Sequence, residues 1–178
     1  MDRRSFMRAA FRIVNSMVVV PAFRLKLGWV ISNPLAGKVM VLGIRGRKTG
    51  RVRYTPVSFA QIGSFIYCYQ GRETKGRWYL NILKNPDVEV MLPRGPRLAG
   101  HAELVAGEEE RAAAIRQILI NSGLNRGMYG FDPRTASEEV LRERTAGLPV
   151  VRIAQLDAKP TLSQTLNMIY VSMIHVSI

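Results

Sequence analysis

The chain has 178 residues, a length that fits one domain with a substantial core and leaves little room for a second. A single cysteine, Cys68, excludes an intramolecular disulfide and fits a reducing compartment. The net charge is +13, and residues 1–55 carry 12 Lys or Arg against one acid, Asp2. Such a basic N-terminal third attracts polyanions: nucleic acid, an anionic membrane, or a phosphorylated cofactor.

The first residues contain a motif similar to a twin-arginine export signal, from Arg3 to Arg8. However, Arg12 interrupts the approach to the apolar stretch at 13–23, and no small-residue cleavage site follows. We therefore expect no export and a cytoplasmic location.

Residues 6–17 favour an amphipathic helix, which Pro21 would end or kink. The apolar stripe of this helix consists of Phe6, Ala10, Ile13 and Met17. Arginines at 4, 8 and 12 lie on another face. This pattern suits packing on the core, or peripheral contact with the anionic inner face of a membrane, and both interpretations stay open.

The middle of the chain predicts short strands joined by turns. The strand candidates are residues 39–44, 53–60, 64–70, 88–92, 100–105 and 150–156. Helices are predicted at 78–84 and 108–121, and Ser137 can cap a third, short one. Six or so strands with few helices between them argue against a doubly wound parallel sheet. They predict a mainly β fold, an antiparallel barrel with peripheral helices.

We expect three segments along the chain. Residues 1–35 would form the N-terminal amphipathic helix and a linker, and residues 36–157 the barrel. Residues 158–178 would form a C-terminal helical extension, whose run from 161 carries no formal charge and is short for a bilayer span. We expect this extension to cover the core or a partner.

A glycine-bounded basic turn spans residues 43–51, Gly-Ile-Arg-Gly-Arg-Lys-Thr-Gly-Arg. Glycines let backbone N–H groups converge on an anion, and arginine forks bind phosphate oxygens in pairs. The turn is not a P-loop, because Arg47 stands where that motif needs glycine. Taken alone, it predicts either an anion site or a solvated hairpin tip.

A second segment, residues 78–86, reads Trp-Tyr-Leu-Asn-Ile-Leu-Lys-Asn-Pro. Together with the turn at 46–50, with Arg53 and Thr55-Pro56, and with residues 144–151, it resembles the deazaflavin (F420)-dependent nitroreductase family. The resemblance covers roughly residues 36–156. It implies a split β-barrel of the FMN-binding, pyridoxamine-phosphate-oxidase-like type. It also implies hydride transfer from reduced coenzyme F420 to a small organic acceptor: a quinone, an enone or a nitro compound.

The resemblance also implies a set of site residues. The phosphate of the coenzyme would be held by Arg47, Lys48, Thr49 and Gly50, with Arg51 or Arg53 adding charge. The backbone at Pro56, Val57 and Ser58 would face the ring, and Trp78 and Asn81 would shape its pocket and the phosphate side. Gln70 stands where family members known for nitro-drug reduction carry a serine, and Tyr129 would contact the acceptor.

Alternatives remain open at this stage. Related barrels bind FMN or haem, and a non-catalytic protein at a membrane surface could use the same fold. A homodimer is compatible with the sequence. No nucleic-acid motif accompanies the charge, and two histidines, His101 and His175, are too few for a typical histidine-rich metal site. We expect His101 and Cys68 to be structural.

Overall fold

The fold is described from a computed structural model, which places residues 15–33, 35, 37–71, 74, 76–127 and 129–156. The twin-arginine-like motif, most of the predicted N-terminal helix and the C-terminal run lie outside the described residues.

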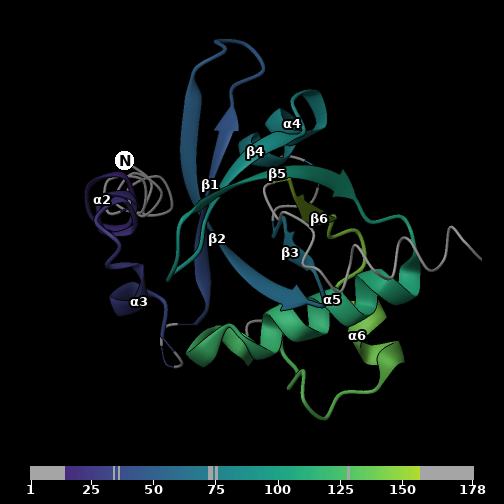
Figure 1. Cartoon of the computed structure of the whole chain (residues 1–178). Helices are drawn as coiled ribbons and strands as arrows, with labels where there is room; N and C mark the ends of the chain where they lie inside the picture. Colours follow the sequence, from purple (N-terminus) through teal and green to yellow (C-terminus); the bar gives the residue numbers. More distant parts are fainter. Residues whose placement is uncertain are drawn as a thin grey trace, which may run out of the picture.

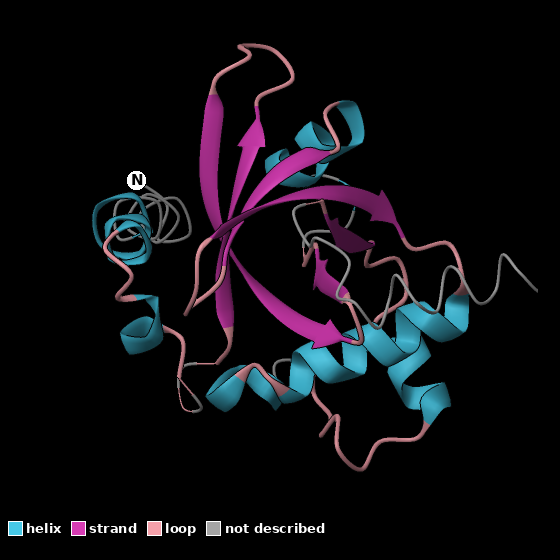
Figure 2. Ribbon diagram, in the orientation of Figure 1, coloured by secondary structure: helices cyan, strands magenta, loops and turns pink. Residues whose placement is uncertain are grey.

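Six antiparallel strands close into a barrel in the order β1–β2–β3–β6–β5–β4 (Figures 1 and 2). Their bounds are β1 (Val39–Arg45), β2 (Val52–Ile62), β3 (Phe65–Tyr69), β4 (Asp87–Met91), β5 (Arg97–Leu104) and β6 (Val150–Gln155). The helices are η1 (Asn15–Val19), α2 (Val20–Arg24), α3 (Gly28–Ile31), α4 (Arg77–Lys84), α5 (Glu108–Ile120), η3 (Gly123–Gly127) and α6 (Glu138–Arg144). The prediction of a mainly β barrel with peripheral helices is confirmed.

Apolar side chains that point inward from alternate positions on the strands fill the barrel interior. On β1, Met40, Leu42 and Ile44 are almost completely buried and belong to one core cluster with inward residues of the other strands. Helix α4 adds Tyr79 and Ile82 to the same cluster. The helix therefore packs directly against the interior of the barrel.

Helices cover the outside of the barrel. The apolar side of α5, including Ile115 and Leu119, packs against the outward residues Ala60 and Val150. Val20 and Phe23 of α2 pack against Val41, on the opposite face of β1 from the interior. The described part of the N-terminal helix thus packs on the barrel.

Two local expectations were wrong. Pro21 does not end the N-terminal helix, because it lies in the first turn of α2, where a missing N–H costs no hydrogen bond. A π-helical turn, η1, precedes it, and the helix continues to Arg24. Strand β2 runs to Ile62, two residues past the end of the strand expected at 53–60, and Gly63 follows with a positive φ of 59°. Among the described residues, no helix is long and apolar enough to cross a membrane.

Candidate functional site

The first half of β2 has one unpaired edge. Residues 52–58 pair with β1, whereas pairing with β3 begins only at Phe59. The β1–β2 hairpin consequently stands out from one end of the barrel, with α4 beside it (Figure 1). Backbone groups on such an edge are available to a ligand. The predicted ring contacts lie here: Val57 points into the core, and its half-buried neighbours Pro56 and Ser58 point outward.

The basic turn joins the ends of these two strands and is closed by its own backbone. The N–H of Gly46 donates to the carbonyl of Arg51 at 2.9 Å, and the N–H of Gly50 donates to the carbonyl of Gly46 at 2.8 Å. Gly50 has a φ of 65°, a left-handed conformation that favours glycine. The turn is therefore a defined loop that presents its side chains outward.

Polar groups of the turn lie close around Gly46. A Cβ added to Gly46 would lie 3.0 Å from the Thr49 hydroxyl oxygen, 3.2 Å from the Arg51 carbonyl oxygen and 3.9 Å from Arg53 Nε. The absence of a side chain at Gly46 lets the Thr49 hydroxyl and the Arg53 guanidinium both lie close to this part of the turn. Both groups can donate to a phosphate oxygen.

Two asparagines connect the turn to α4. Asn81 Oδ1 accepts from the backbone N–H of Arg47 at 3.2 Å and from the Arg47 guanidinium at 3.3 Å. Asn85 Nδ2 donates to the carbonyl of Arg45 at 3.2 Å. The two segments that carry the resemblance are therefore in direct contact. Asn85 was predicted only as the end of the helix, although it belongs to the matching segment.

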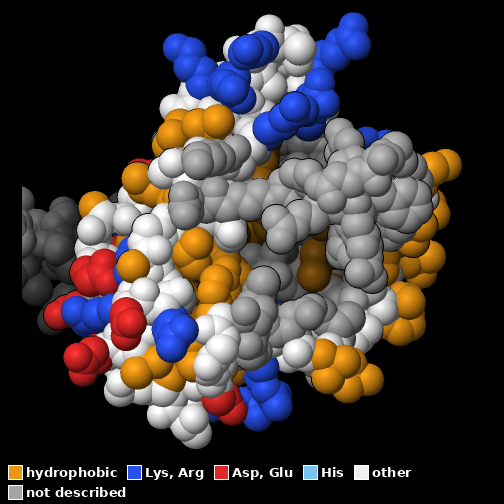
Figure 3. All heavy atoms as spheres, turned by 180° about the vertical axis from the view of Figure 1, so that it is seen from behind, with side chains coloured by type: hydrophobic (Ala, Val, Ile, Leu, Met, Phe, Trp, Pro, Cys, Tyr) orange, Lys and Arg blue, Asp and Glu red, His pale blue; other side chains and the backbone are white. Residues whose placement is uncertain are grey.

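The turn carries cations that no acid among the described residues neutralises. In the part of the chain that the structure describes, every ion pair lies elsewhere, and none involves Arg47, Lys48, Arg51 or Arg53. All four residues are exposed. Figure 3 shows Lys and Arg side chains gathered at the end of the molecule where the hairpin projects. This concentration of positive charge fits a phosphate or a carboxylate ligand.

The start of α4 is packed against the end of β3. Gln70 is buried, and its side-chain amide lies where a Cβ on Gly76 would be, so Gly76 admits this contact only as glycine. Trp78 follows in the first turn of α4, half-buried against the barrel core. Gln70 and Trp78 thus lie near one end of α4, whereas Asn81 contacts the basic turn further along the helix.

Tyr129 reaches the same region from the loop after α5. Its hydroxyl donates to the hydroxyl of Tyr69 at 3.3 Å, and a Cβ on Gly71 would lie 3.5 Å from it. Burial raises the pKa of Tyr69 well above its usual value, and the hydrogen bond with Tyr129 adds to the shift. This phenol therefore stays protonated and can act as a hydrogen-bond donor. Sequence reasoning missed Tyr69, since only proximity in space reveals the pair.

Cys68 and His101 have structural surroundings, as predicted. Burial raises the pKa of the Cys68 thiol to about 12, which keeps it an unreactive thiol at neutral pH. His101 Nδ1 lies 2.8 Å from Asp87 Oδ1 on the neighbouring strand.

Comparison with protein families gives one match. The model of the family described as F420H(2)-dependent quinone reductase matches residues 18–128, which is more than half of the chain. A comparison with curated proteins found no match.

The chain is similar to several solved structures. A conserved hypothetical protein of Mycobacterium tuberculosis is 17% identical, with a TM-score of 0.51 over 68% of this chain and 74% of that chain. An F420-H2 dependent reductase is 19% identical, with a TM-score of 0.43 over 65% and 93% of the two chains. The haem storage protein of Vibrio cholerae is 15% identical, with a TM-score of 0.47 over 78% and 89%.

Proposed function

Because the chain belongs to the F420H(2)-dependent quinone reductase family, we propose that it passes hydride from reduced coenzyme F420 to a quinone. The chain is an F420-dependent oxidoreductase, and coenzyme F420 is its cofactor. The choice of acceptor is the proposal. Enones and nitro compounds are the other acceptor classes to be tested.

The contact between Arg47 and Asn81 is the observation that best supports this proposal. It joins the basic turn to α4, so that one anionic, ring-containing molecule could contact both segments. The residues proposed to hold its phosphate are Arg47, Lys48, Thr49, Gly50, Arg51 and Arg53. Their exposed positive charge, which no acid among the described residues pairs with, fits a phosphate group.

The ring of the coenzyme is proposed to lie along the unpaired edge of β2, at Pro56, Val57 and Ser58. Trp78 and Gln70 would bound the ring side of the site, and Asn81 the phosphate side. Trp78 and Asn81 are three positions apart in α4, which places them about 4.5 Å apart along the helix axis. Ring and phosphate would then contact neighbouring positions of the same helix.

Reduction of a quinone to a hydroquinone takes one hydride and one proton. The hydride comes from reduced coenzyme F420, which is oxidised by two electrons, and the proton comes from solvent. The protein must hold the acceptor at the ring and exclude water from it. Tyr129 is proposed to hydrogen-bond the acceptor oxygen, where a phenol stabilises the negative charge that develops. Tyr69, which stays protonated, would then donate to the Tyr129 hydroxyl 3.3 Å away, so that the one Tyr129 hydrogen points to the acceptor.

A fluorescence titration with coenzyme F420 tests the phosphate assignment. We expect the double variant Arg47→Ala, Lys48→Ala to bind about 100-fold more weakly, because it loses two charge-assisted contacts. Arg134→Ala, which removes an exposed cation from the loop before α6, should leave binding unchanged. Tight binding of FMN together with no binding of coenzyme F420 would overturn the assignment of the cofactor.

The acceptor is tested by following oxidation of the reduced coenzyme. Turnover is compared for a water-soluble naphthoquinone, an enone and a nitroaromatic compound under the same conditions. We expect the quinone to have the highest kcat/KM. A higher kcat/KM for either other class would replace the quinone as the proposed acceptor.

Three earlier expectations stay proposals. Residues 36–157 would form the coenzyme-binding unit, with 158–178 as an extension. The protein could form a homodimer. Peripheral contact of the N-terminal helix with the inner face of a membrane involves residues 1–14, which lie outside the described residues.

FMN and haem remain alternatives only for related barrels, since the family of this chain uses coenzyme F420.

A further inference from the structure

Helix α5 carries an arginine that holds the backbone of a neighbouring loop. The Arg116 side chain is half-buried, and its guanidinium Nη1 donates to two backbone carbonyl oxygens, that of Pro133 at 2.8 Å and that of Ala136 at 2.9 Å. Both carbonyls belong to the loop that joins η3 to α6 and that carries Tyr129 (Figure 1). One nitrogen atom therefore fastens the end of this loop to α5.

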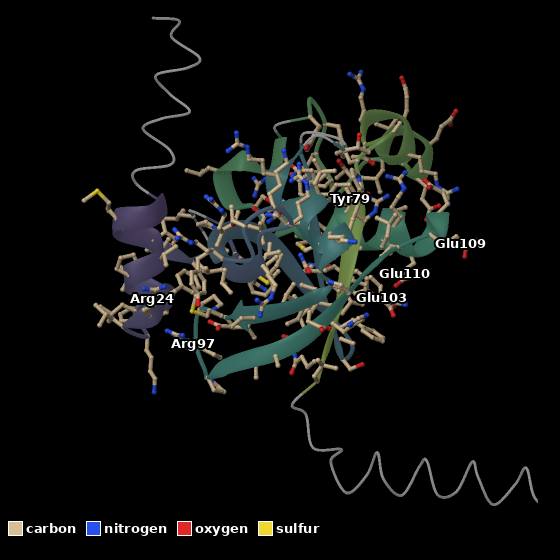
Figure 4. The ribbon with its side chains drawn as sticks, turned by 90° about the horizontal axis from the view of Figure 1, so that it is seen from above. Arg24, Tyr79, Arg97, Glu103, Glu109 and Glu110 are labelled. Carbon is tan, nitrogen blue, oxygen red and sulfur yellow. The ribbon has the colours of Figure 1, made fainter. Side chains whose placement is uncertain are left out.

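The charge of Arg116 is not taken up by an acid among the residues that the structure describes. None of the six ion pairs there involves it. The acids of α5 all lie in its first turn, and Figure 4 shows Glu109 and Glu110 on the opposite side of the molecule from Arg24. Arg116 lies six positions beyond Glu110, about 9 Å further along the helix axis. The cation is therefore directed at the loop carbonyls, and a charged donor makes stronger hydrogen bonds than a neutral one.

The loop turns so that both carbonyls meet the same nitrogen atom. The Asp132 side chain accepts from the N–H of Arg134 at 3.0 Å, and the Asp132 carbonyl accepts from the N–H of Ala136, also at 3.0 Å. These two hydrogen bonds close residues 132–136 into one turn, in which Pro133 is buried. Arg116 consequently holds a closed turn against α5, and not a single extended strand of chain.

Tyr129 lies three residues before this turn. Its neighbour Gly130 has a φ of 79°, and a Cβ at that position would meet nothing within 4 Å. A glycine of this kind gives the chain little stiffness, so contacts with the rest of the molecule must fix Tyr129. One such contact is the packing of Tyr129 and Phe131 against the cluster that includes the apolar side of α5. The turn held by Arg116 is another, and it limits where the Tyr129 hydroxyl can lie.

We propose that Arg116 is a positioning residue for the reduction of the acceptor. By holding the 132–136 turn against α5, it keeps the Tyr129 hydroxyl where the acceptor oxygen develops negative charge. The inference rests on the proposed function, which assigns Tyr129 to the acceptor. A hydrogen bond that is already in place costs no reorganisation in the transition state, so we expect the contact to act on kcat.

Steady-state kinetics of the full chain, with reduced coenzyme F420 and a water-soluble naphthoquinone, test the proposal. Arg116→Met keeps an apolar stem and loses the donors, so we expect kcat to fall about fivefold, with little change in KM or in coenzyme affinity. Arg116→Lys keeps a cation that can donate to both carbonyls. We expect it to recover most of the lost kcat.

A double-mutant cycle shows whether Arg116 acts through Tyr129. The Tyr129→Phe variant already lacks the hydroxyl that Arg116 is proposed to position. In that background, Arg116→Met should lower kcat by less than about twofold more. Independent effects would instead multiply, as they would for a residue that contributes only to stability.

Arg111 provides a matched control on the same helix. It is also half-buried, and its guanidinium donates to the carbonyl of Thr145 at 3.1 Å, just after α6. Arg111→Met should lower the melting temperature at least as much as Arg116→Met, because it also breaks the ion pair with Glu108, but it should leave kcat unchanged. Hydrogen exchange at the Ala136 amide should become faster in Arg116→Met alone.

Three results would overturn the inference. Arg116→Met could keep the kcat of the wild type, its effect could multiply with that of Tyr129→Phe, or Arg111→Met could lower kcat as much. These results differ from a failure of the proposed function. If Tyr129→Phe keeps full kcat, the assignment of Tyr129 to the acceptor is wrong and the role of Arg116 falls with it. If the wild type does not oxidise the reduced coenzyme at all, the proposed reaction itself is wrong.

Discussion

Arg47 and Asn81, 34 positions apart in the chain, share one oxygen atom: Asn81 Oδ1 accepts from both the backbone N–H and the guanidinium of Arg47. Asn81 is only 7% exposed, so the packing of α4 holds this oxygen in a fixed position. The exposed turn above it, with its unneutralised cations, is thereby fixed against the helix. A preformed arrangement of this kind lowers the entropy cost of binding a ligand.

Removing this contact is expected to weaken coenzyme binding. Asn81→Ala leaves the Arg47 N–H without its acceptor, and we expect affinity for coenzyme F420 to fall about tenfold, as for the loss of one or two hydrogen bonds. Asn81→Asp keeps the acceptor but brings a negative charge to the phosphate side, so it should bind the coenzyme more weakly still. Fluorescence titration measures both affinities. Equal binding by Asn81→Asp and the wild type would contradict the phosphate assignment.

Adding a methyl group at Gly46 is expected to disturb the site. In Gly46→Ala the new methyl would approach the Thr49 hydroxyl and the Arg51 carbonyl at 3.0 and 3.2 Å, so the turn must shift. We expect weaker coenzyme binding by about tenfold, with the barrel still folded by circular dichroism. Gly107→Ala is the control, because its Cβ meets only Glu110 Cβ, at 3.9 Å. Unchanged binding in Gly46→Ala would show that the coenzyme phosphate does not depend on the conformation of this turn.

Tyr129→Phe should separate acceptor reduction from coenzyme binding. The variant loses the hydroxyl that donates to Tyr69 and that we propose to face the acceptor oxygen. We expect kcat for quinone reduction to fall about tenfold, with coenzyme affinity unchanged. Tyr67→Phe is the matched control, since it removes a phenol that donates to Glu110, at 2.9 Å, under α5. A loss of activity as large in Tyr67→Phe would attribute the effect to stability.

Cys68 is expected to resist thiol reagents while the protein is folded. Its pKa of about 12 leaves almost no thiolate at pH 8, and its side chain is buried, so labelling should require unfolding. The raised pKa also predicts a pH dependence. The unfolded thiol ionises near pH 9 and the folded one near pH 12, so its stabilising contribution is complete below pH 9 and is lost as the pH rises.

Two measurements check these expectations. Labelling of the native protein is followed by mass spectrometry, with and without denaturant. The unfolding free energies of the wild type and of Cys68→Ala are measured from pH 8 upward. The wild type should lose stability relative to the variant as the pH rises. Rapid labelling of the folded protein at pH 8 would disprove burial of the thiol.

The sequence predicted the elements whose patterns are local. Apolar alternation located all six strands within a few residues, and α4 and α5 were found from their helical spacing and end signals. The Ser137 cap was also predicted, and its hydroxyl accepts from the Val140 N–H at 3.3 Å. Each of these features depends on neighbouring residues, which is why the sequence alone suffices.

Features that depend on distant contacts were not predictable in the same way. Helix α3 has only four residues and no capping side chain, so the sequence contains no pattern that predicts it. The hydrogen bond between Tyr129 and Tyr69 joins residues 60 positions apart, and the unpaired edge of β2 follows from where β3 ends. For the candidate site, a resemblance indicated Arg47 and Asn81 separately, and only the fold shows that they touch.

Strand β1 separates Lys38, just before the strand, from the basic turn that follows it. Its seven residues extend over about 20 Å, from the residue after Lys38 to Arg45 at the basic turn. Electrostatic interaction in physiological salt fades over about 8 Å. Phosphate groups held at the basic turn would therefore feel almost nothing of the charge on Lys38, which lies at the ring end of the proposed site.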